Sequence, residues 1–199
     1  MLSKFEKALN ELNYKFIKHL EAIETSLKDK ELHEEFFLID LKEFDNEVIA
    51  FLALYHPQGE FLREVIAYLK ISSFLSKIKK STKAFIKKYD FNNSKIDALY
   101  QNALSTIEIL KLAVKGDTIE DAFSTIVSYE KIADEIYKEL IIEVKQKDNI
   151  DEILKILNIA KKLERISDNA KTIASYLLYA KEGIEIWLQL VLLKMKKIY

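Results

Sequence analysis

The chain has 199 residues, of which 49% are hydrophobic and 32% charged, and its formal net charge is −1. This composition excludes a disordered chain and fits one globular domain or two small repeats with a sizeable core. The absence of cysteine excludes disulfides, thiolate metal sites and a cysteine nucleophile. The near-neutral charge and the lack of a recognisable binding motif argue against nucleic acid as a partner.

No signal peptide or transmembrane segment is expected. The N-terminal sequence MLSKFEKALNELNYKF alternates charged and apolar residues, and the longest apolar stretch, 187–193, is followed by lysines. A membrane-spanning helix needs about 20 apolar residues, far more than this stretch supplies. A cytoplasmic location is therefore the expectation.

Long stretches with apolar residues three and four apart predict helices, because only three glycines and one proline interrupt the chain. The expected fold class is all-α. In chain order, six helices are expected at about 2–28, 31–55, 58–89, 94–115, 117–146 and 150–182.

The breaks between these helices carry turn and capping residues. Pro57 with Gly59 divides the second helix from the third, and the polar segment 90–94 divides the third from the fourth. Gly116 is expected to end the fourth helix. The predicted N-caps of the last two helices are Asp117 or Thr118, and Asp148 or Asn149.

Three helices, a polar joint and three more helices indicate an internal duplication. The halves align at a nearly constant offset, because Asp45 matches Asp134 (134 − 45 = 89) and Leu75 matches Leu163 (163 − 75 = 88). The expected division is a first repeat over 1–90, a second over 94–185 and an apolar, basic tail over 186–199. The tail is expected to dock within the protein, with a second subunit or a membrane-bound partner as open alternatives.

The helix expected over 117–146 places two carboxylates on its packing seam. Carboxylates in a core need a charged or hydrogen-bonding partner or a cation, because an isolated buried carboxylate is strongly unfavourable. The predicted seam residues are Phe123, Val127, Glu130, Asp134, Tyr137, Ile141 and Val144.

The helix expected over 150–182 sets Glu164 and Asp168 beside its own seam, four residues apart. An antiparallel neighbour would bring Glu130 and Asp134 opposite them. Two interpretations of these residues stay open. In the first, the four acids, Glu130, Asp134, Glu164 and Asp168, bind a cation such as Mg, Mn, Fe or Zn. Alternatively, they form solvated salt bridges with neighbours such as Lys161 and Lys171.

The first half departs from this acidic pattern. The positions that match Glu164 and Asp168 are Ser76 and Lys80, and Lys79 stands at the Ser167 position. We expect Lys79 or Lys80 to pair with Asp45 in place of a cation.

Three lysines, Lys80, Lys83 and Lys87, recur on one face of the third expected helix and are called the lysine stripe. The stripe is either a solvated face or a surface for an anionic partner or anionic lipid. The three histidines, His19, His33 and His56, are scattered and are expected to be surface or partly packed side chains. With no glycine-rich phosphate loop either, catalysis has little support.

Three segments carry a resemblance to a known family. LERISDNAKTIA, from Leu163, resembles the LERIGDxAxxIA signature of PhoU proteins, with Ser167 in place of glycine. YEKIADEIY, from Tyr129, is similar to the acidic motif that precedes it. HPQGEFLREVIAYLKI, from His56, is similar to QPxAxDLRxxxAxLKI, with Phe61 where the family has aspartate. The resemblance covers about 35–183.

The resemblance implies two tandem three-helix repeats that form a six-helix bundle, often as a homodimer. It also implies a non-catalytic regulator of phosphate uptake, linking the ATPase of a phosphate ABC transporter to a sensor histidine kinase and restraining the phosphate-starvation response. Some PhoU proteins bind iron or other metals on their acidic motifs, which carries a metal over to the four acids. The loss of the matching acids at Ser76 and Lys80 puts a first metal cluster in doubt.

Two other classes of function stay open. A metal-dependent helical enzyme would use carboxylates in a bundle, but the Glu-x-x-His ligand pattern is absent. A structural or dimerisation module would use the acids only in salt bridges and the tail as an interface.

Overall fold

The computed structural model describes residues 3–38, 40–88 and 93–183. These residues form helices and no strand, which confirms the all-α fold class. The helices are α1 (Lys4–Asp29), α2 (Glu34–Leu38), α3 (Leu41–Tyr55), α4 (Gly59–Ile86), α5 (Ser94–Gly116), α6 (Ile119–Val144) and α7 (Ile150–Glu182).

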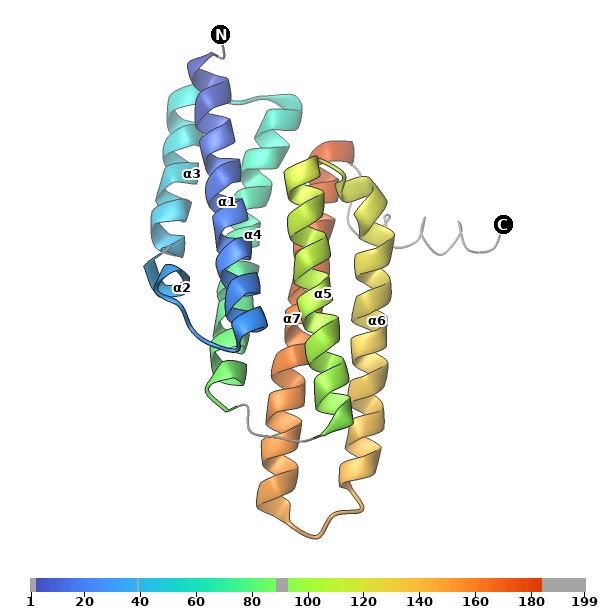
Figure 1. Ribbon diagram of the computed structural model, residues 1–199. Coiled ribbons are helices and arrows are strands. Elements are labelled where there is room, and N and C mark those ends of the chain that lie inside the picture. The colour runs from blue at the N-terminus through green and yellow to red at the C-terminus, as the bar shows by residue number, and fades with distance from the viewer. Residues whose placement is uncertain (1–2, 39, 89–92, 184–199) are drawn as a thin grey trace, which may run out of the picture.

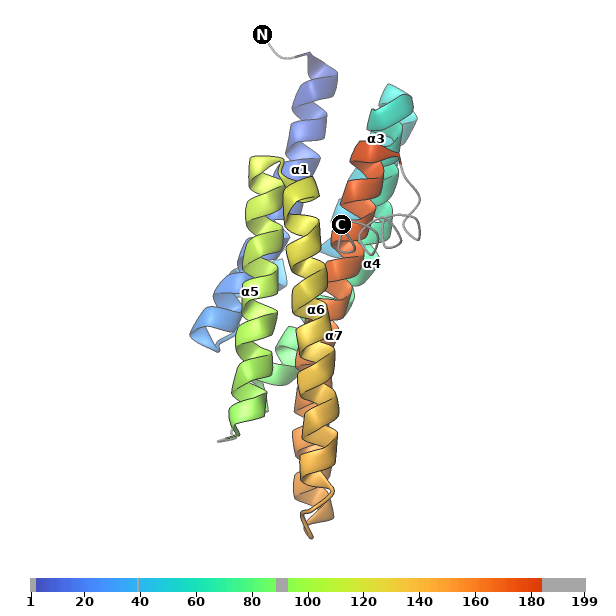
Figure 2. The same ribbon diagram turned by 90° about the vertical axis from the view of Figure 1, so that its right-hand side faces the viewer.

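The helices form two groups that lie side by side (Figure 1). Helices α1, α3 and α4 pack together with α2 against α1, and helices α5, α6 and α7 form the other group. The groups meet where α4 packs against α7 and α1 against α5. The α6–α7 hairpin extends beyond the end of the first group, as a view from the side also shows (Figure 2).

The single helix expected over 31–55 is wrong, because the chain forms two helices, α2 and α3, in this region. Asp40 caps the N-terminus of α3, and its carboxylate accepts a hydrogen bond from the Lys42 amide at 2.9 Å. The side chain of an N-cap residue competes with helix continuation by satisfying an amide that would otherwise have no partner. The short α2 therefore turns the chain between α1 and α3.

The expected N-cap Asn149 is present, and one expected helix end is displaced. Asn149 caps α7 through its side-chain oxygen, and Asn93, which was not predicted as a cap, does the same for α5. Gly116 is the last residue of α5, whereas Asp117 takes the left-handed conformation, with φ of 54°. Aspartate tolerates this region better than most residues, so the left-handed position does not require glycine. Thr118 precedes α6 without a side-chain cap.

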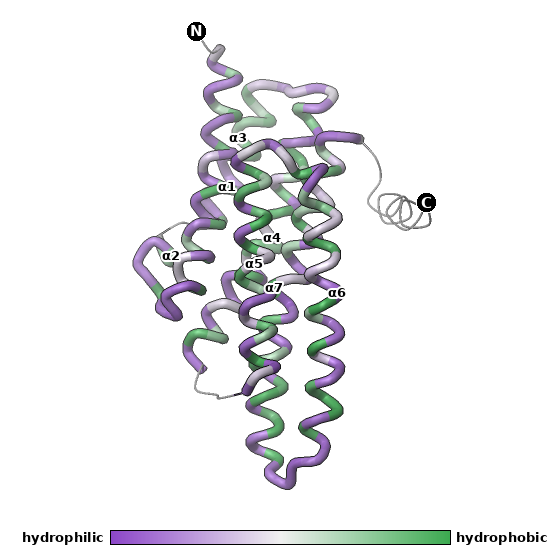
Figure 3. The backbone as a smooth tube through the Cα atoms, turned by 45° about the vertical axis from the view of Figure 1, so that its right-hand side comes forward, coloured by the Kyte–Doolittle hydropathy of each residue, from purple (hydrophilic) through white to green (hydrophobic). Residues whose placement is uncertain are grey.

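The core contains apolar residues of both groups. Figure 3 shows hydrophobic positions in green and hydrophilic positions in purple recurring along the helices. Helix α7 contacts α4, α5 and α6, and several of its small residues, among them Ala160, Ala170 and Ala174, are fully buried. Small side chains let neighbouring helices approach closely. This helix therefore occupies the centre of the molecule.

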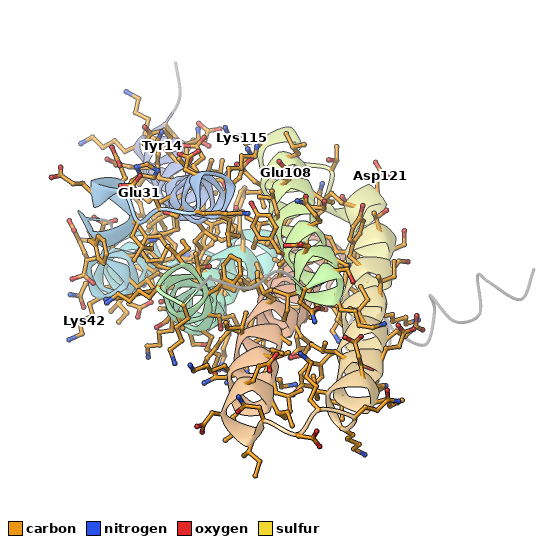
Figure 4. The ribbon with its side chains drawn as sticks, turned by 60° about the horizontal axis from the view of Figure 1, so that its bottom comes forward. Tyr14, Glu31, Lys42, Glu108, Lys115 and Asp121 are labelled. Atoms are coloured by element: carbon orange, nitrogen blue, oxygen red, sulfur yellow. The ribbon has the colours of Figure 1, made fainter. Side chains whose placement is uncertain are left out.

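The first and second groups are also joined by polar contacts between α1 and α5. Glu24 is 5% exposed and pairs with Lys28 on its own helix and with Lys111 on α5. Tyr100 donates a hydrogen bond of 2.9 Å to the Leu27 carbonyl. Lys115, labelled in Figure 4 at the end of α5 near α1, lies 2.5 Å from Glu21. These contacts fix the relative position of the two groups.

Among the described residues, no helix combines the length and apolarity needed to cross a bilayer. The predicted tail over 186–199, and its docking, lie outside the described residues.

Candidate functional site

The acids of α6 lie at the edge of its packing seam. The expectation that Glu130 and Asp134 face the core is wrong, because the buried stripe runs through Ile126, Ala133 and Leu140. The side chain of Glu130 is 21% exposed and that of Asp134 is 44% exposed. Spacing alone permits either stripe, but the cost of burying carboxylates selects the apolar one.

Lys171 of α7 joins acids from two helices. Its Nζ lies 2.7 Å from Glu130 Oε1 on α6 and 3.6 Å from Asp168 Oδ1 on its own helix. The lysine side chain is only 23% exposed, so its charge is partly shielded from water. The antiparallel packing of α6 and α7 expected from the sequence thus places an ammonium group between Glu130 and Asp168.

The remaining two acids each have a lysine partner on the same helix. Glu164 is 12% exposed, and Lys161 Nζ lies 2.8 Å from its Oε2. That oxygen is buried and makes no hydrogen bond, so the contact is an ion pair whose angles do not suit a hydrogen bond. The ammonium of Lys161 also lies 4.9 Å from the centre of the Tyr137 ring. Asp134 accepts a hydrogen bond from Lys138, which raises the pKa of that lysine.

This arrangement of the four acids does not fit a metal ion. A metal site needs several carboxylates to converge on one point, with the positive charge supplied by the ion. Within the ranges that the structure describes, no group of three or more His, Cys, Asp or Glu side chains is arranged to hold a metal. The salt bridges Lys161–Glu164 and Lys171–Asp168 that the sequence allows are present.

A buried polar network lies directly beneath these acids, and sequence reasoning missed it. Ser167 of α7 donates a hydrogen bond of 2.9 Å to the side-chain oxygen of Asn102 on α5. Asn102 in turn donates from Nδ2 to the Tyr129 carbonyl of α6 at 3.0 Å. Thr106 donates to the Asn102 carbonyl at 2.7 Å. The network ties three helices together at the position where the acidic motifs begin.

The signal for this network was available in the sequence. Asn102 and Thr106 stand four residues apart on the otherwise apolar buried face of α5. Polar residues at such positions need partners inside the core, because an unpaired buried polar group is costly. Ser167 supplies one partner while remaining small enough for close packing of α7.

The first group places Asp45 and the expected lysines differently. Asp45 is half-buried, and its Oδ1 is buried and accepts no hydrogen bond. The Nζ of Lys79 lies 5.0 Å from the centre of the Phe36 ring. Burial lowers the pKa of Lys79, and attraction to Asp40 partly opposes that shift. The pairing of Asp45 with Lys79 or Lys80 stays a prediction.

The lysine stripe of α4 faces solvent. Lys80, Lys83 and Lys87 are all exposed, and Lys83 also lies over the ring of Phe37 at 5.2 Å. Exposed lysines on one helix face attract an acidic surface and are screened by salt.

The segment that begins at His56 connects α4 to the end of α7. Arg63 Nε donates a hydrogen bond of 3.1 Å to the Ala180 carbonyl. Its guanidinium also lies against Gly183, where a Cβ would be 3.4 Å from the Arg63 carbon Cζ. The arginine therefore binds the C-terminal end of α7, where unpaired carbonyls favour a positive charge.

Known proteins resemble this chain in sequence and in fold. Residues 96–177 match the PhoU domain model. The chain is 28% identical over 191 aligned residues to the phosphate-specific transport system accessory protein PhoU homolog of Borreliella burgdorferi, with 82% of each chain covered. Residues 96–177 therefore resemble a PhoU domain, in agreement with the motifs read from the sequence.

Two solved PhoU structures share its fold. The phosphate transport system regulatory protein PhoU of Streptococcus pneumoniae aligns with a TM-score of 0.75 and 21% identity, covering 91% of this chain and 98% of that one. PhoU from Pseudomonas aeruginosa aligns with a TM-score of 0.64 and 20% identity, covering 90% and 96%. The match to the PhoU domain model spans α5, α6 and most of α7, so it includes the four acids and the buried network.

Proposed function

We propose that this PhoU protein is a non-catalytic cytoplasmic adaptor of a phosphate transport system. It binds the ATPase of a phosphate ABC transporter and a sensor histidine kinase, and it holds down the phosphate-starvation response when phosphate is plentiful. The PhoU domain over 96–177 carries this proposal, together with a relative whose name describes an accessory protein of phosphate-specific transport. The long exposed helix faces suit an adaptor, because they offer surfaces to more than one partner.

The lysine stripe is the surface that we assign to an acidic partner. Its three side chains are exposed on α4 and at its C-cap, whereas acids of α6 and α7 are already paired with lysines. A like-charged array of this kind gains free energy when an acidic surface approaches, and it accelerates encounter at low salt.

Reversing the charges of the stripe tests this assignment. The variant Lys80→Glu/Lys83→Glu/Lys87→Glu is compared with Lys42→Glu/Lys131→Glu/Lys155→Glu, which changes net charge equally at exposed lysines on other helices. We expect the first variant to lose capture of the kinase or the transporter ATPase in pulldowns, and the second to retain it. Equal binding by both variants would show that the lysine stripe does not bind the partner. Failure of the wild type to capture either the kinase or the transporter ATPase would reject the adaptor proposal.

A dimerisation module is the second candidate, and exposed apolar residues favour it. Ile49 and Leu54 of α3 and Phe61 of α4 are 55%, 74% and 47% exposed. Exposed apolar side chains of this size often mark an interface. We expect a homodimer in sedimentation equilibrium, and Leu54→Glu is expected to shift it toward the monomer. A monomeric wild type would contradict this candidate without touching the adaptor.

A further inference from the structure

The start of α4 and the end of α7 lie side by side (Figure 1). Arg63 of α4 joins them, because its Nε donates a hydrogen bond of 3.1 Å to the Ala180 carbonyl and its guanidinium lies against Gly183. Gly183 caps α7 in the left-handed conformation, with φ of 69°, so the helix ends there. The chain therefore leaves α7 directly beside Arg63.

Arg63 has a hydrogen-bonding capacity that the described residues do not use. A guanidinium carries five N–H donors, and the bond to Ala180 uses one of them. Among the described residues, no carboxylate forms an ion pair with Arg63. The side chain is half-buried, and a carboxylate suits it because carboxylates accept two guanidinium N–H bonds in parallel. An acid that follows Gly183 in the sequence would meet this requirement.

Two apolar side chains next to Arg63 are only partly covered by the described residues. Leu62 and Ile66 are 36% and 39% exposed, and they lie four residues apart on one face of α4. Ile66 follows Arg63 by about one helical turn, a distance of about 5 Å along the helix. Apolar residues that covered this face would gain free energy, because burial removes apolar surface from water.

The sequence after Gly183 contains both an acid and apolar residues. Glu185 is the second residue after Gly183, and Trp187 follows it closely. Within 184–193, every residue is apolar except Glu185 and Gln189. Even at the helical rise of about 1.5 Å per residue, a segment of this length reaches about 15 Å, farther than the turn from Arg63 to Ile66. Its attachment at Gly183 also gives it a higher effective concentration at α4 than a separate partner has.

We propose that the segment 184–193 docks on α4: Glu185 pairs with Arg63, and Trp187 with its apolar neighbours covers Leu62 and Ile66. The contact gives a location to the docking within the protein that the sequence led us to expect. It is independent of the adaptor proposal, and it uses residues other than those assigned to a homodimer. Because α4 and α7 belong to different groups, the docked segment strengthens the junction between the groups.

Fluorescence of the full chain tests the docking, because Trp187 is its single tryptophan. The variant Leu62→Glu/Ile66→Glu replaces the apolar face with charge, so we expect Trp187 emission to shift to longer wavelength and acrylamide to quench it more strongly. The control Ile150→Glu/Leu154→Glu makes the same change at exposed residues at the opposite end of α7, and it should match the wild type. Unchanged emission in the first variant, or an equal shift in both, would overturn the proposal.

A charge exchange tests the pair of Arg63 with Glu185. Glu185→Arg alters no contact between described residues, and it is expected to expose Trp187 to acrylamide. The control is Glu182→Arg, at an exposed acid on the last turn of α7, which should leave Trp187 protected. Arg63→Glu should also expose Trp187, and Arg63→Glu/Glu185→Arg should restore its protection. Unchanged quenching in Glu185→Arg, or no recovery in the exchanged variant, would reject the pairing.

Two further measurements identify the surface that covers Trp187. Docking within one chain makes the emission independent of protein concentration and of added vesicles of anionic lipid. Protection that is lost on dilution would assign the segment to a second copy of the chain. Protection that arises only with vesicles would assign it to a membrane surface. Either result would overturn docking on α4.

Discussion

The two groups of helices treat the same position in opposite ways. Ser167 of α7 corresponds to Lys79 of α4 (167 − 79 = 88). In the second group, Ser167 and Asn102 complete each other's hydrogen bonds, and the core is closed. In the first group, Lys79 lies near His19, whose nitrogens have no partner. The two aligned positions therefore hold a serine within a satisfied polar network in one group and a lysine near an unsatisfied buried histidine in the other.

The acidic residues also differ between the two groups. In the second group, lysines of α7 lie beside the carboxylates and compensate them. In the first group, Ser76 and Lys80 replace the corresponding acids, and only Asp45 remains. Both groups are helical bundles although their charges differ, because a bundle is fixed by its apolar seam and tolerates many polar patterns at the edge.

Breaking the closed network should have the largest effect. The variant Asn102→Leu leaves the Ser167 hydroxyl without its acceptor and the Tyr129 carbonyl without its side-chain donor. We expect a loss of about 3 kcal/mol in the free energy of unfolding, since buried polar groups without partners cost about 1–3 kcal/mol each. Urea unfolding measures it. The exposed neighbour Gln101→Leu is the control, and a loss shared equally by both variants would contradict a role for the network.

The buried histidine His19 should make the free energy of unfolding depend on pH. The folded-state pKa of His19 is about 3 and its ordinary value is 6.5, so the unfolded chain binds a proton first as pH falls. Stability from this group is complete above about pH 6.5 and is lost between there and pH 3. Between pH 7 and 5, the wild type should lose about 2 kcal/mol more than His19→Leu.

Urea unfolding at both pH values measures that difference. The control is His56→Asn, at an exposed left-handed position that asparagine tolerates. It should follow the wild type. Parallel pH profiles for the wild type and His19→Leu would show that His19 is not buried in its neutral form.

The smallest effect is expected for the lysines beside the four acids. Lys171→Met removes the cation between Glu130 and Asp168, and should cost about 1 kcal/mol because the pair is half-buried. Combined with Lys161→Met, it leaves the four acids with fewer cations. That double variant should therefore take up Mn²⁺ or Zn²⁺ more readily than the wild type, measured by elemental analysis of protein purified without chelator.

Elemental analysis also tests whether the four acids bind a metal in the wild type. Stoichiometric metal in the wild type that is lost in Glu164→Gln/Asp168→Asn would show that the lysines yield to an ion. Absence of metal from the wild type and from both variants would leave the acids as salt-bridge partners.

The sequence predicted most of the fold, because helix formation depends on local patterns. Apolar spacing and the cap at Asn149 located the helices. The duplication inferred from the offset between Asp45 and Asp134 stays a prediction. The break at Asp40 was missed, since its capping bond overrides an apolar pattern that continues across it. The seam of α6 was predicted correctly at Phe123, Val127 and Val144, but not at Glu130 and Asp134, because a second stripe fits the same spacing between them.

The sequence by itself determined the α class, the family resemblance and the antiparallel order of the acidic helices, all of which follow from patterns along the chain. Only the tertiary structure decided where each charge finds a partner. It placed Lys171 between Glu130 and Asp168, joined Ser167 to Asn102, and left the nitrogens of His19 unpaired. These outcomes depend on distances of a few ångströms between helices far apart in sequence, and hydrogen bonds and ion pairs lose most of their strength beyond such distances.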